Sequence, residues 1–288
     1  MDIKTLTFNS QNYPQVLRRL KGRPKQLYCM GANLNELLLQ KSVAIVGTRT
    51  ISIYGEQVTR KFASELAEQG LIIVSGLALG VDELAHRSAL EAGGQCIAVL
   101  PCPLDNIVPN SNQKLAEQIV EQGGALVSEY APGEPPFKQY FIARNRIMSG
   151  LADAVLITEA GAKSGALHTA GFAEAQNKPL FAVPGNITNI GSVGVNNLIK
   201  SHKAAMVSEP KDVLLSMGIT PHQTPSRRVH GRNQNEQTLL NLMLEGVSDG
   251  DKLMEKSGLS LSEFNRALTM LEIASKVRPL GMNHWAIY

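Results

Sequence analysis

The sequence is poor in cysteine and in long apolar runs, and both shortages exclude classes of protein. It has three cysteines in 288 residues, Cys29, Cys96 and Cys102, and no C-x-x-C pair. Neither a disulfide framework nor a zinc site is therefore predicted, which is typical of a reducing compartment. No apolar run approaches the roughly 18 residues of a membrane span, and the N-terminus has no basic-then-apolar leader. We expect a soluble, cytoplasmic protein without membrane contacts.

Charge is scarce as well. Charged residues make up 18% of the chain and the formal net charge is only +3. A low charged content is expected where parallel strands are buried on both faces. Because the net charge is so small, any nucleic-acid binding must come from cations that cluster locally.

Short apolar runs alternate with helical patterns from Ser42 to about Met217. The predicted strands cover residues 43–47, 71–75, 96–100, 125–129, 154–158, 180–183 and, more weakly, 204–207. The predicted helices between them cover residues 56–69, 81–92, 111–122, 144–151, 165–177 and 195–201. This alternation predicts an α/β fold, a Rossmann-like doubly wound and mostly parallel sheet. Such a sheet places its binding site at the carboxyl ends of the strands.

Four segments follow from the composition. Residues 1–41 carry two short helical patterns, 13–20 and 34–40, and are predicted to form a helical cap that leads into the Rossmann-like domain, residues 42–220. Residues 221–235 contain Arg227, Arg228 and Arg232 but no acid, which indicates a basic linker. Residues 236–288 show three helical patterns, 236–244, 251–256 and 261–275, and a strand pair that turns near 281–283. Three helices and a hairpin predict a small winged-helix domain.

The first candidate site follows the first strand. Gly47, Thr48 and Arg49 stand where the strand opens towards a helix. Glycine allows close approach of the backbone to a ligand, and the planar guanidinium suits phosphate. An exposed turn arginine with no ligand is the alternative. The pattern is not G-x-G-x-x-G, so a nicotinamide dinucleotide site is not predicted.

The second strand also ends in glycines, Gly76 and Gly80, just before a predicted helix. Asp82 is placed to cap that helix. His86 lies one helical turn later and invites a catalytic interpretation. The sequence sets no serine or cysteine beside it, so we expect a packed histidine.

Lys163, Ser164 and Gly165 form the third turn, after the strand that ends near Glu159. A lysine just before a helix N-terminus adds a point charge where backbone N–H groups already favour an anion. Glu159 is expected to orient that lysine or to cap the neighbouring loop. Because Lys163 precedes Gly165, the stretch is not a Walker A loop, and ATP hydrolysis is not predicted.

Arg144 and Arg146 are separated by two positions, so on a helix their side chains diverge by about 200°. One is expected to face the cleft, while the other pairs with a carboxylate or faces solvent. Lys138, Tyr140 and Phe141 precede them. Aromatic side chains interleaved with cations suit single-stranded nucleic acid, because bases stack on the rings while cations hold the phosphates.

The order of these motifs resembles the DNA-processing protein A family (DprA, also called Smf). The resemblance rests on SVAIVGTR, SGLALGVDELAH, GALVSEY, FIARNRIMSGL and TEAGAKSGALHTA, and covers roughly residues 12–208. It implies a Rossmann-like domain that binds single-stranded DNA, forms a homodimer and hands the DNA to RecA recombinase during natural transformation. By motif position it adds Lys114 to Arg49 and Lys163 in a basic DNA-binding pocket, and places Arg144 and Arg146 in the family's RNR signature.

Two alternatives belong to other functional classes. Similar Rossmann variants include LOG-type phosphoribohydrolases, which carry a PGGxGTxxE loop where this chain has EAGAKSGALHTA. The double glycine and the catalytic glutamate of that loop are not matched here. A sensor that binds a nucleotide in the same cleft is the second alternative. We predict no catalytic residue, no metal and no cofactor.

Overall fold

The chain forms two compact units, residues 1–222 and 223–288. The computed structural model describes residues 2–135, 137–222, 231–274 and 276–287. Each unit has a hydrophobic core of its own. Among the described residues, no helix combines the length and the apolar character needed to cross a bilayer.

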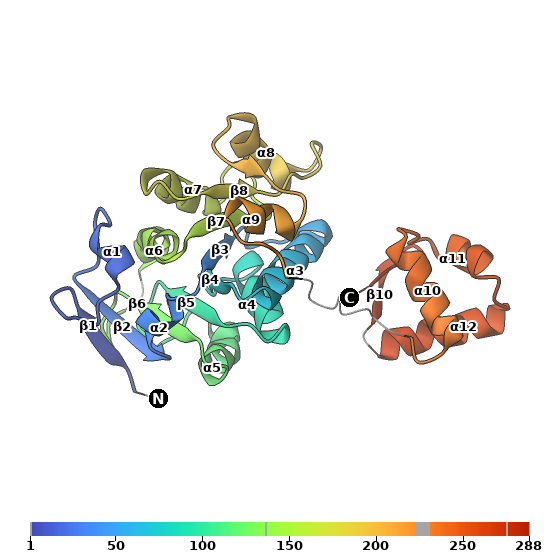
Figure 1. Cartoon of the computed structure of the whole chain (residues 1–288), viewed down its shortest axis with the longest axis horizontal. Helices are drawn as coiled ribbons and strands as arrows, with labels where there is room; N and C mark the ends of the chain where they lie inside the picture. The colour runs from blue at the N-terminus through green and yellow to red at the C-terminus, as the bar shows by residue number, and fades with distance from the viewer. Residues whose placement is uncertain (1, 136, 223–230, 275, 288) are drawn as a thin grey trace. The chain divides into compact units, whose positions relative to one another are not determined.

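The first unit is built on one large sheet (Figure 1). Its strand order over the described residues is β1-β2-β6-β5-β4-β3-β7-β8-β9, and the strands from β3 to β9 pair parallel with one another. The parallel strands are β3 (Ser42–Val46), β4 (Ile72–Ser75), β5 (Cys96–Leu100), β6 (Ala125–Ser128), β7 (Ala154–Ile157), β8 (Leu180–Ala182) and β9 (Ala205–Met206). The predicted Rossmann-like, mostly parallel sheet is confirmed.

Helices cover both faces of this sheet, as the alternation of side chains along β3 illustrates. Val43 and Ile45 pack into one core, whereas Ala44 and Val46 pack into the other, because successive strand residues point to opposite faces. The first core is shared with α3 (Ile53–Glu68), α4 (Val81–Glu91), α5 (Gln113–Glu121) and α9 (Pro210–Ser216). The second is shared with α1 (Gln15–Arg18), α2 (Leu34–Leu37), α6 (Lys138–Leu151), α7 (Ala166–Ala175) and α8 (Val193–Lys200) (Figure 1).

The predicted helical cap over residues 1–41 is wrong in part. The two helices in this segment span only four residues each, and the segment also contributes strands β1 (Lys4–Thr7) and β2 (Gln26–Gly31). These strands form an antiparallel hairpin that extends the sheet beside β6. In β2 the buried Leu27 and Cys29 alternate with more exposed neighbours, which is a strand pattern. By pairing with β6, β2 also provides hydrogen-bond partners for backbone groups of β6 that would otherwise be unpaired.

Two helices of the sheet domain differ most from the expected ones. α6 begins at Lys138, six residues before the predicted start. α9 was not predicted, although the sequence carries its start signal. Pro210 occupies the first helical turn, while Glu209 and Asp212 form a capping box.

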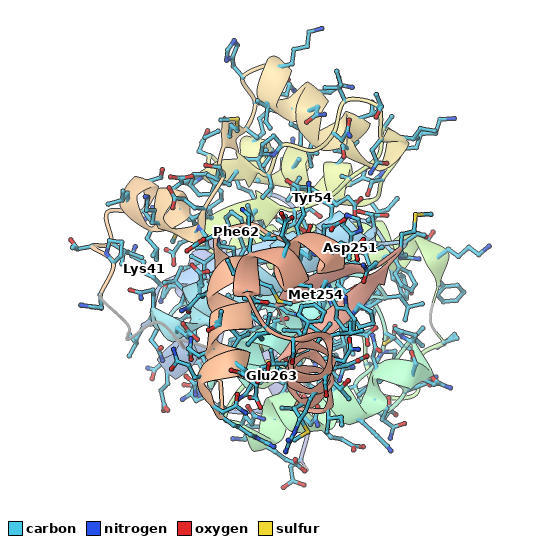
Figure 2. All side chains as sticks on the ribbon, turned by 90° about the vertical axis from the view of Figure 1, so that its right-hand side faces the viewer. Lys41, Tyr54, Phe62, Asp251, Met254 and Glu263 are labelled. Carbon is cyan, nitrogen blue, oxygen red and sulfur yellow. The ribbon has the colours of Figure 1, made fainter. Side chains whose placement is uncertain are left out.

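The second unit contains α10 (Gln234–Leu244), α11 (Gly250–Ser257), α12 (Leu261–Ile273) and the hairpin of β10 (Val277–Gly281) and β11 (His284–Ile287). Asp251 and Met254 lie on α11 and Glu263 on α12 (Figure 2). Leu239, Leu253 and Leu271 are fully buried in its core. Three helices and a hairpin thus occupy the predicted places, while the winged-helix assignment stays a prediction. Most of the expected linker, with Arg227 and Arg228, lies outside the described residues.

Candidate nucleic-acid interface

The candidate site lies where the order of the parallel strands reverses. From β3 the chain proceeds to β4, β5 and β6 on one side, and β7 returns to the other side of β3. The loops that follow β3 and β7 therefore leave neighbouring strands in opposite directions. In doubly wound sheets ligands bind at this point, outside the carboxyl ends of the strands.

Backbone hydrogen bonds join the loops that follow β3, β4 and β7. The Thr48 N–H donates to the carbonyl oxygen of Glu159 over 2.8 Å, and the Val81 N–H donates to the Thr48 carbonyl oxygen over 3.1 Å. The loop after β3 is thereby fixed between the loop after β7 and the start of α4. Backbone hydrogen bonds therefore set the positions of these loops relative to one another.

Glycine is required at Gly80 for two reasons. Its φ of 82° lies in the left-handed region, which side chains disfavour. A Cβ there would also overlap the carbonyl oxygen of Thr48. Gly76, at the other end of the same loop, has no room for a side chain because the guanidinium of Arg144 occupies that space.

Arg49 is exposed at the centre of this edge, and it is held by an aromatic ring. Its guanidinium carbon lies 4.8 Å from the ring centroid of Phe141 on α6. A cation over an aromatic face is stabilised and oriented while its N–H groups stay available to a ligand. This contact brings the start of α6 into the site.

Two residues near the start of α6, Phe141 and Lys138, therefore join the site. Phe141 supports Arg49, and the exposed Lys138 lies three positions before it, one turn away on the same side of α6. Nearby, the rings of Tyr130 and Tyr140 are stacked with centroids 3.7 Å apart. The sequence signal was the interleaving of aromatic residues and cations.

Lys163, Ser164 and Gly165 lie where predicted, in the loop between β7 and α7. Lys163 is exposed, and Gly165 is the N-cap residue of α7. The Ser164 N–H donates to the Gly161 carbonyl oxygen over 3.1 Å, which closes the turn. The lysine thus stands at a helix N-terminus beside the loop that carries Arg49, an arrangement that favours an anion.

One arginine of the pair Arg144 and Arg146 was expected to face the cleft, but Arg144 does not reach the surface. It is 3% exposed, and its guanidinium donates to the carbonyl oxygens of Gly76 (2.6 Å) and Val99. Its Nη2 lies 4.0 Å from Oδ2 of the buried Asp82. Burial lowers the pKa of Arg144 to about 10, with the charge of Asp82 opposing the shift. Arg144 therefore supports the loop after β4 from beneath.

Asp82 does not cap α4 through its own side chain, contrary to the expectation. Its Oδ2 accepts the Gly76 N–H over 3.1 Å. Burial raises the pKa of Asp82, while the neighbouring Arg144 lowers it. The carboxylate and the guanidinium hold the same glycine from two directions.

Arg146 is also engaged within the fold. Its Nη2 donates to both carboxylate oxygens of Glu129, at 2.7 and 2.8 Å, and its Nε donates to the Gly22 carbonyl oxygen at 2.7 Å. The expectation that one arginine of the pair meets a carboxylate is met by Arg146. Neither arginine offers a free guanidinium to phosphate in this structure, because the other is buried.

Lys114 is exposed in the first turn of α5, the helix that follows β5. The nearby Asn112 ties this region to the site, since its Nδ2 donates to the Leu77 carbonyl oxygen over 3.0 Å. Lys114 thus lies on the same edge of the sheet, two strands away from β3.

Of the residues that could have served catalysis, Asp82, His86 and Glu159 are buried. His86 is fully buried, and burial lowers its pKa to about 3. Glu159 is buried and its Oε2 accepts the N–H of Ser52, the N-cap residue of α3, over 2.9 Å. It caps the neighbouring loop, one of its two predicted roles. His168 is exposed on α7. Within the described ranges, no group of three or more His, Cys, Asp or Glu residues is placed to hold a metal ion.

The family model for "DNA recombination-mediator protein A" matches residues 4–218. The chain belongs to this family. The protein Smf of Escherichia coli is 38% identical over 274 residues, which cover 92% of this chain and 72% of that protein. The DNA processing protein DprA of Streptococcus pneumoniae is 41% identical over 202 residues, 70% of each chain. The chain spans only 54% of the Smf protein of Synechocystis.

Solved structures of the family share the fold. The X-ray structure of DprA from Streptococcus pneumoniae aligns with a TM-score of 0.69 and 37% identity, covering 75% of this chain and 74% of that one. DprA from Helicobacter pylori aligns with a TM-score of 0.67 and 38% identity, covering 75% of this chain and 96% of that one. The Helicobacter structure concerns the binding of single-stranded DNA by that protein. The predicted resemblance is thus confirmed, and the chain is a DNA-processing protein of recombination.

Proposed function

We propose that this chain is a non-enzymatic protein that binds single-stranded DNA along the carboxyl edge of its large sheet. The observation that carries the proposal is the placement of Arg49 over the ring of Phe141, on a loop tied to the one that leads to Lys163. An oriented guanidinium and an ammonium at a helix N-terminus suit successive phosphates. Two further exposed lysines, Lys138 at the start of α6 and Lys114 at the start of α5, add positive charge to this edge.

Single strands suit this edge better than duplex DNA. Phe137, at the start of α6, is 48% exposed, so its ring is accessible to an unpaired base. Base stacking on such rings tolerates any sequence, because every base has a π-face. We therefore expect binding that is largely sequence-independent and weakened by salt.

The partners and the cellular task remain part of this proposal. We propose that the protein forms a homodimer, protects incoming DNA and loads RecA recombinase during natural transformation. The family's description as a recombination mediator supports this role, as does the single-stranded DNA studied with the Helicobacter relative. The C-terminal unit is a weaker candidate for duplex DNA, because α12 presents Arg266 and Asn265 beside Glu263 and Glu272.

A titration of the purified chain with single-stranded and duplex oligonucleotides across a salt series tests the proposal, with nucleotide turnover measured in the same samples. We expect tight, salt-sensitive binding of the single strand and no release of base or phosphate, with or without Mg²⁺. A hydrolase would need a base near the reacting atom, and Glu159 already accepts a backbone N–H. Turnover that disappears in Glu159→Gln would instead support the phosphoribohydrolase-like alternative. Tight binding of a free nucleotide without turnover would support the sensor.

A further inference from the structure

The loop between β1 and β2 lies at the same edge of the sheet as the candidate site. β2 runs antiparallel to β6, with Tyr28 opposite Ser128 and Gly31 opposite Ala125. The start of β2 is therefore beside the carboxyl end of β6. The loop, residues 8–25, is closed at its base by a hydrogen bond from the Phe8 N–H to the Lys25 carbonyl oxygen at 2.9 Å. We call it the lead-in loop.

The lead-in loop is the most basic part of the chain. Five cations lie within eight residues, namely Arg18, Arg19, Lys21, Arg23 and Lys25. With Lys4, residues 3–35 hold six cations and no carboxylate side chain. Their local charge of +6 exceeds the net charge of +3 of the whole chain. A local excess of this size is the electrostatic footprint of a polyanion site.

Two of the five cations, Arg18 and Arg23, lie over one aromatic ring. The guanidinium carbon of Arg23 lies 4.4 Å from the ring centroid of Phe8, and that of Arg18 lies 5.3 Å from it. Arg18 also donates to the Ser10 carbonyl oxygen over 2.8 Å, and the Tyr13 hydroxyl donates to the Pro24 carbonyl oxygen over 2.7 Å. These contacts fix the loop. They border a hollow of about 550 Å³ lined by Thr7, Phe8, Asn9, Gly22, Arg23 and Lys25.

Helix α6 joins the lead-in loop to the candidate site. Arg146 donates to the carbonyl oxygen of Gly22, next to Arg23, and Phe141 on the same helix supports Arg49. Across the sheet, β2 and β3 are four strand spacings apart in the observed order. At about 4.8 Å per spacing, this is roughly 19 Å, a span that a few nucleotides of an extended strand cover.

We infer that the lead-in loop is a second phosphate-binding surface, which takes the same DNA single strand after it leaves Arg49 and passes the start of α6. Arg23 and Lys25 would hold phosphates at the hollow, where the guanidinium plane of Arg23 offers a stacking face to an unpaired base. This inference rests on the proposed function, because it lengthens the path of the same ligand.

The test compares two lengths of oligothymidylate, about 2 and about 20 nucleotides, because the span of roughly 19 Å takes a few nucleotides of extended strand and only the longer one reaches both surfaces. The variant Arg23→Glu/Lys25→Glu is expected to bind the long strand at least about tenfold more weakly than wild type and the short strand within about twofold. Arg23→Gln/Lys25→Gln should show a smaller loss in the same pattern. The matched control, Lys61→Glu/Lys200→Glu, reverses two exposed lysines on α3 and α8.

The outcomes separate this inference from the proposed function. If wild type binds neither length, the proposed function is wrong. If wild type binds both and the lead-in variants bind the long strand like the control, the second surface does not exist. An equal loss for both lengths in the folded glutamine variant also contradicts it, because the lead-in loop would then belong to the first contact. A loss confined to a duplex of the same length would assign the surface to duplex DNA.

Discussion

Arg49→Glu is expected to weaken binding of single-stranded DNA by roughly tenfold or more, without a change in fold. The substitution removes an oriented phosphate donor and adds a negative charge beside Lys163 and the start of α7. Arg49 is exposed, so its replacement disturbs no core. Fluorescence anisotropy across a salt series measures the loss, and Lys61→Glu, which reverses another exposed cation, is the control.

The salt dependence of binding separates the contribution of the Arg49 charge from that of the Phe141 ring. Arg49→Glu should lower the slope of log K against log salt by about 0.7 or more, because one phosphate contact is lost. Phe141→Ala removes the ring that orients Arg49 but no charge, so it should weaken binding while leaving most of the slope. Wild-type affinity in Arg49→Glu at moderate salt would show that the pocket is assigned wrongly.

Among the arginines of α6, Arg144 should contribute most to the stability of the fold. Arg144→Met is expected to lower the free energy of unfolding by about 3 kcal/mol, because it leaves a buried carboxylate without its counter-charge. Asp82 and the carbonyl oxygens of Gly76 and Val99 lose their partner in this variant. Urea denaturation followed by circular dichroism gives the value.

Two further variants check the cause of that loss. Asp82→Asn/Arg144→Met should be less destabilised than the sum of the two single variants, because the double change leaves no unpaired charge. Arg146→Met should cost less than Arg144→Met, since the ion pair of Arg146 with Glu129 is partly open to solvent. A loss below about 1 kcal/mol in Arg144→Met would contradict a supporting role for the buried pair.

The parallel sheet was predictable because its signals are local. β5 coincides with the predicted strand, and β3 differs by one residue at each end. Buried parallel strands give continuous apolar runs, which stand out between helical patterns. The hairpin of β1 and β2 was missed, because β1 is a four-residue edge strand with no buried side chain and the pairing of β2 with β6 is set by tertiary structure.

The sequence predicted the loops of the candidate site, but not which of its side chains are buried or which distant residues meet there. Gly47, Gly76, Gly80 and Lys163 lie at the predicted carboxyl edge, since strand ends followed by glycine are visible in the sequence. Charge alone could not tell that Arg144 is buried, because a buried and an exposed arginine look the same in one sequence. The contact between Arg49 and Phe141 joins residues far apart in the chain, so no local pattern predicts it.

Photo-cross-linking of a single strand that carries iodouridine, followed by mass spectrometry of the cross-linked peptides, locates the DNA directly. The account predicts cross-links in peptides that contain Phe137, Tyr140 or Phe141, because Phe141 lies against Arg49 and Phe137 packs on the neighbouring Tyr140. Arg49→Glu should reduce these cross-links, whereas Lys61→Glu should leave them unchanged. Cross-links confined to residues 231–287, with none on α6, would contradict the claim that the carboxyl edge of the sheet binds the DNA.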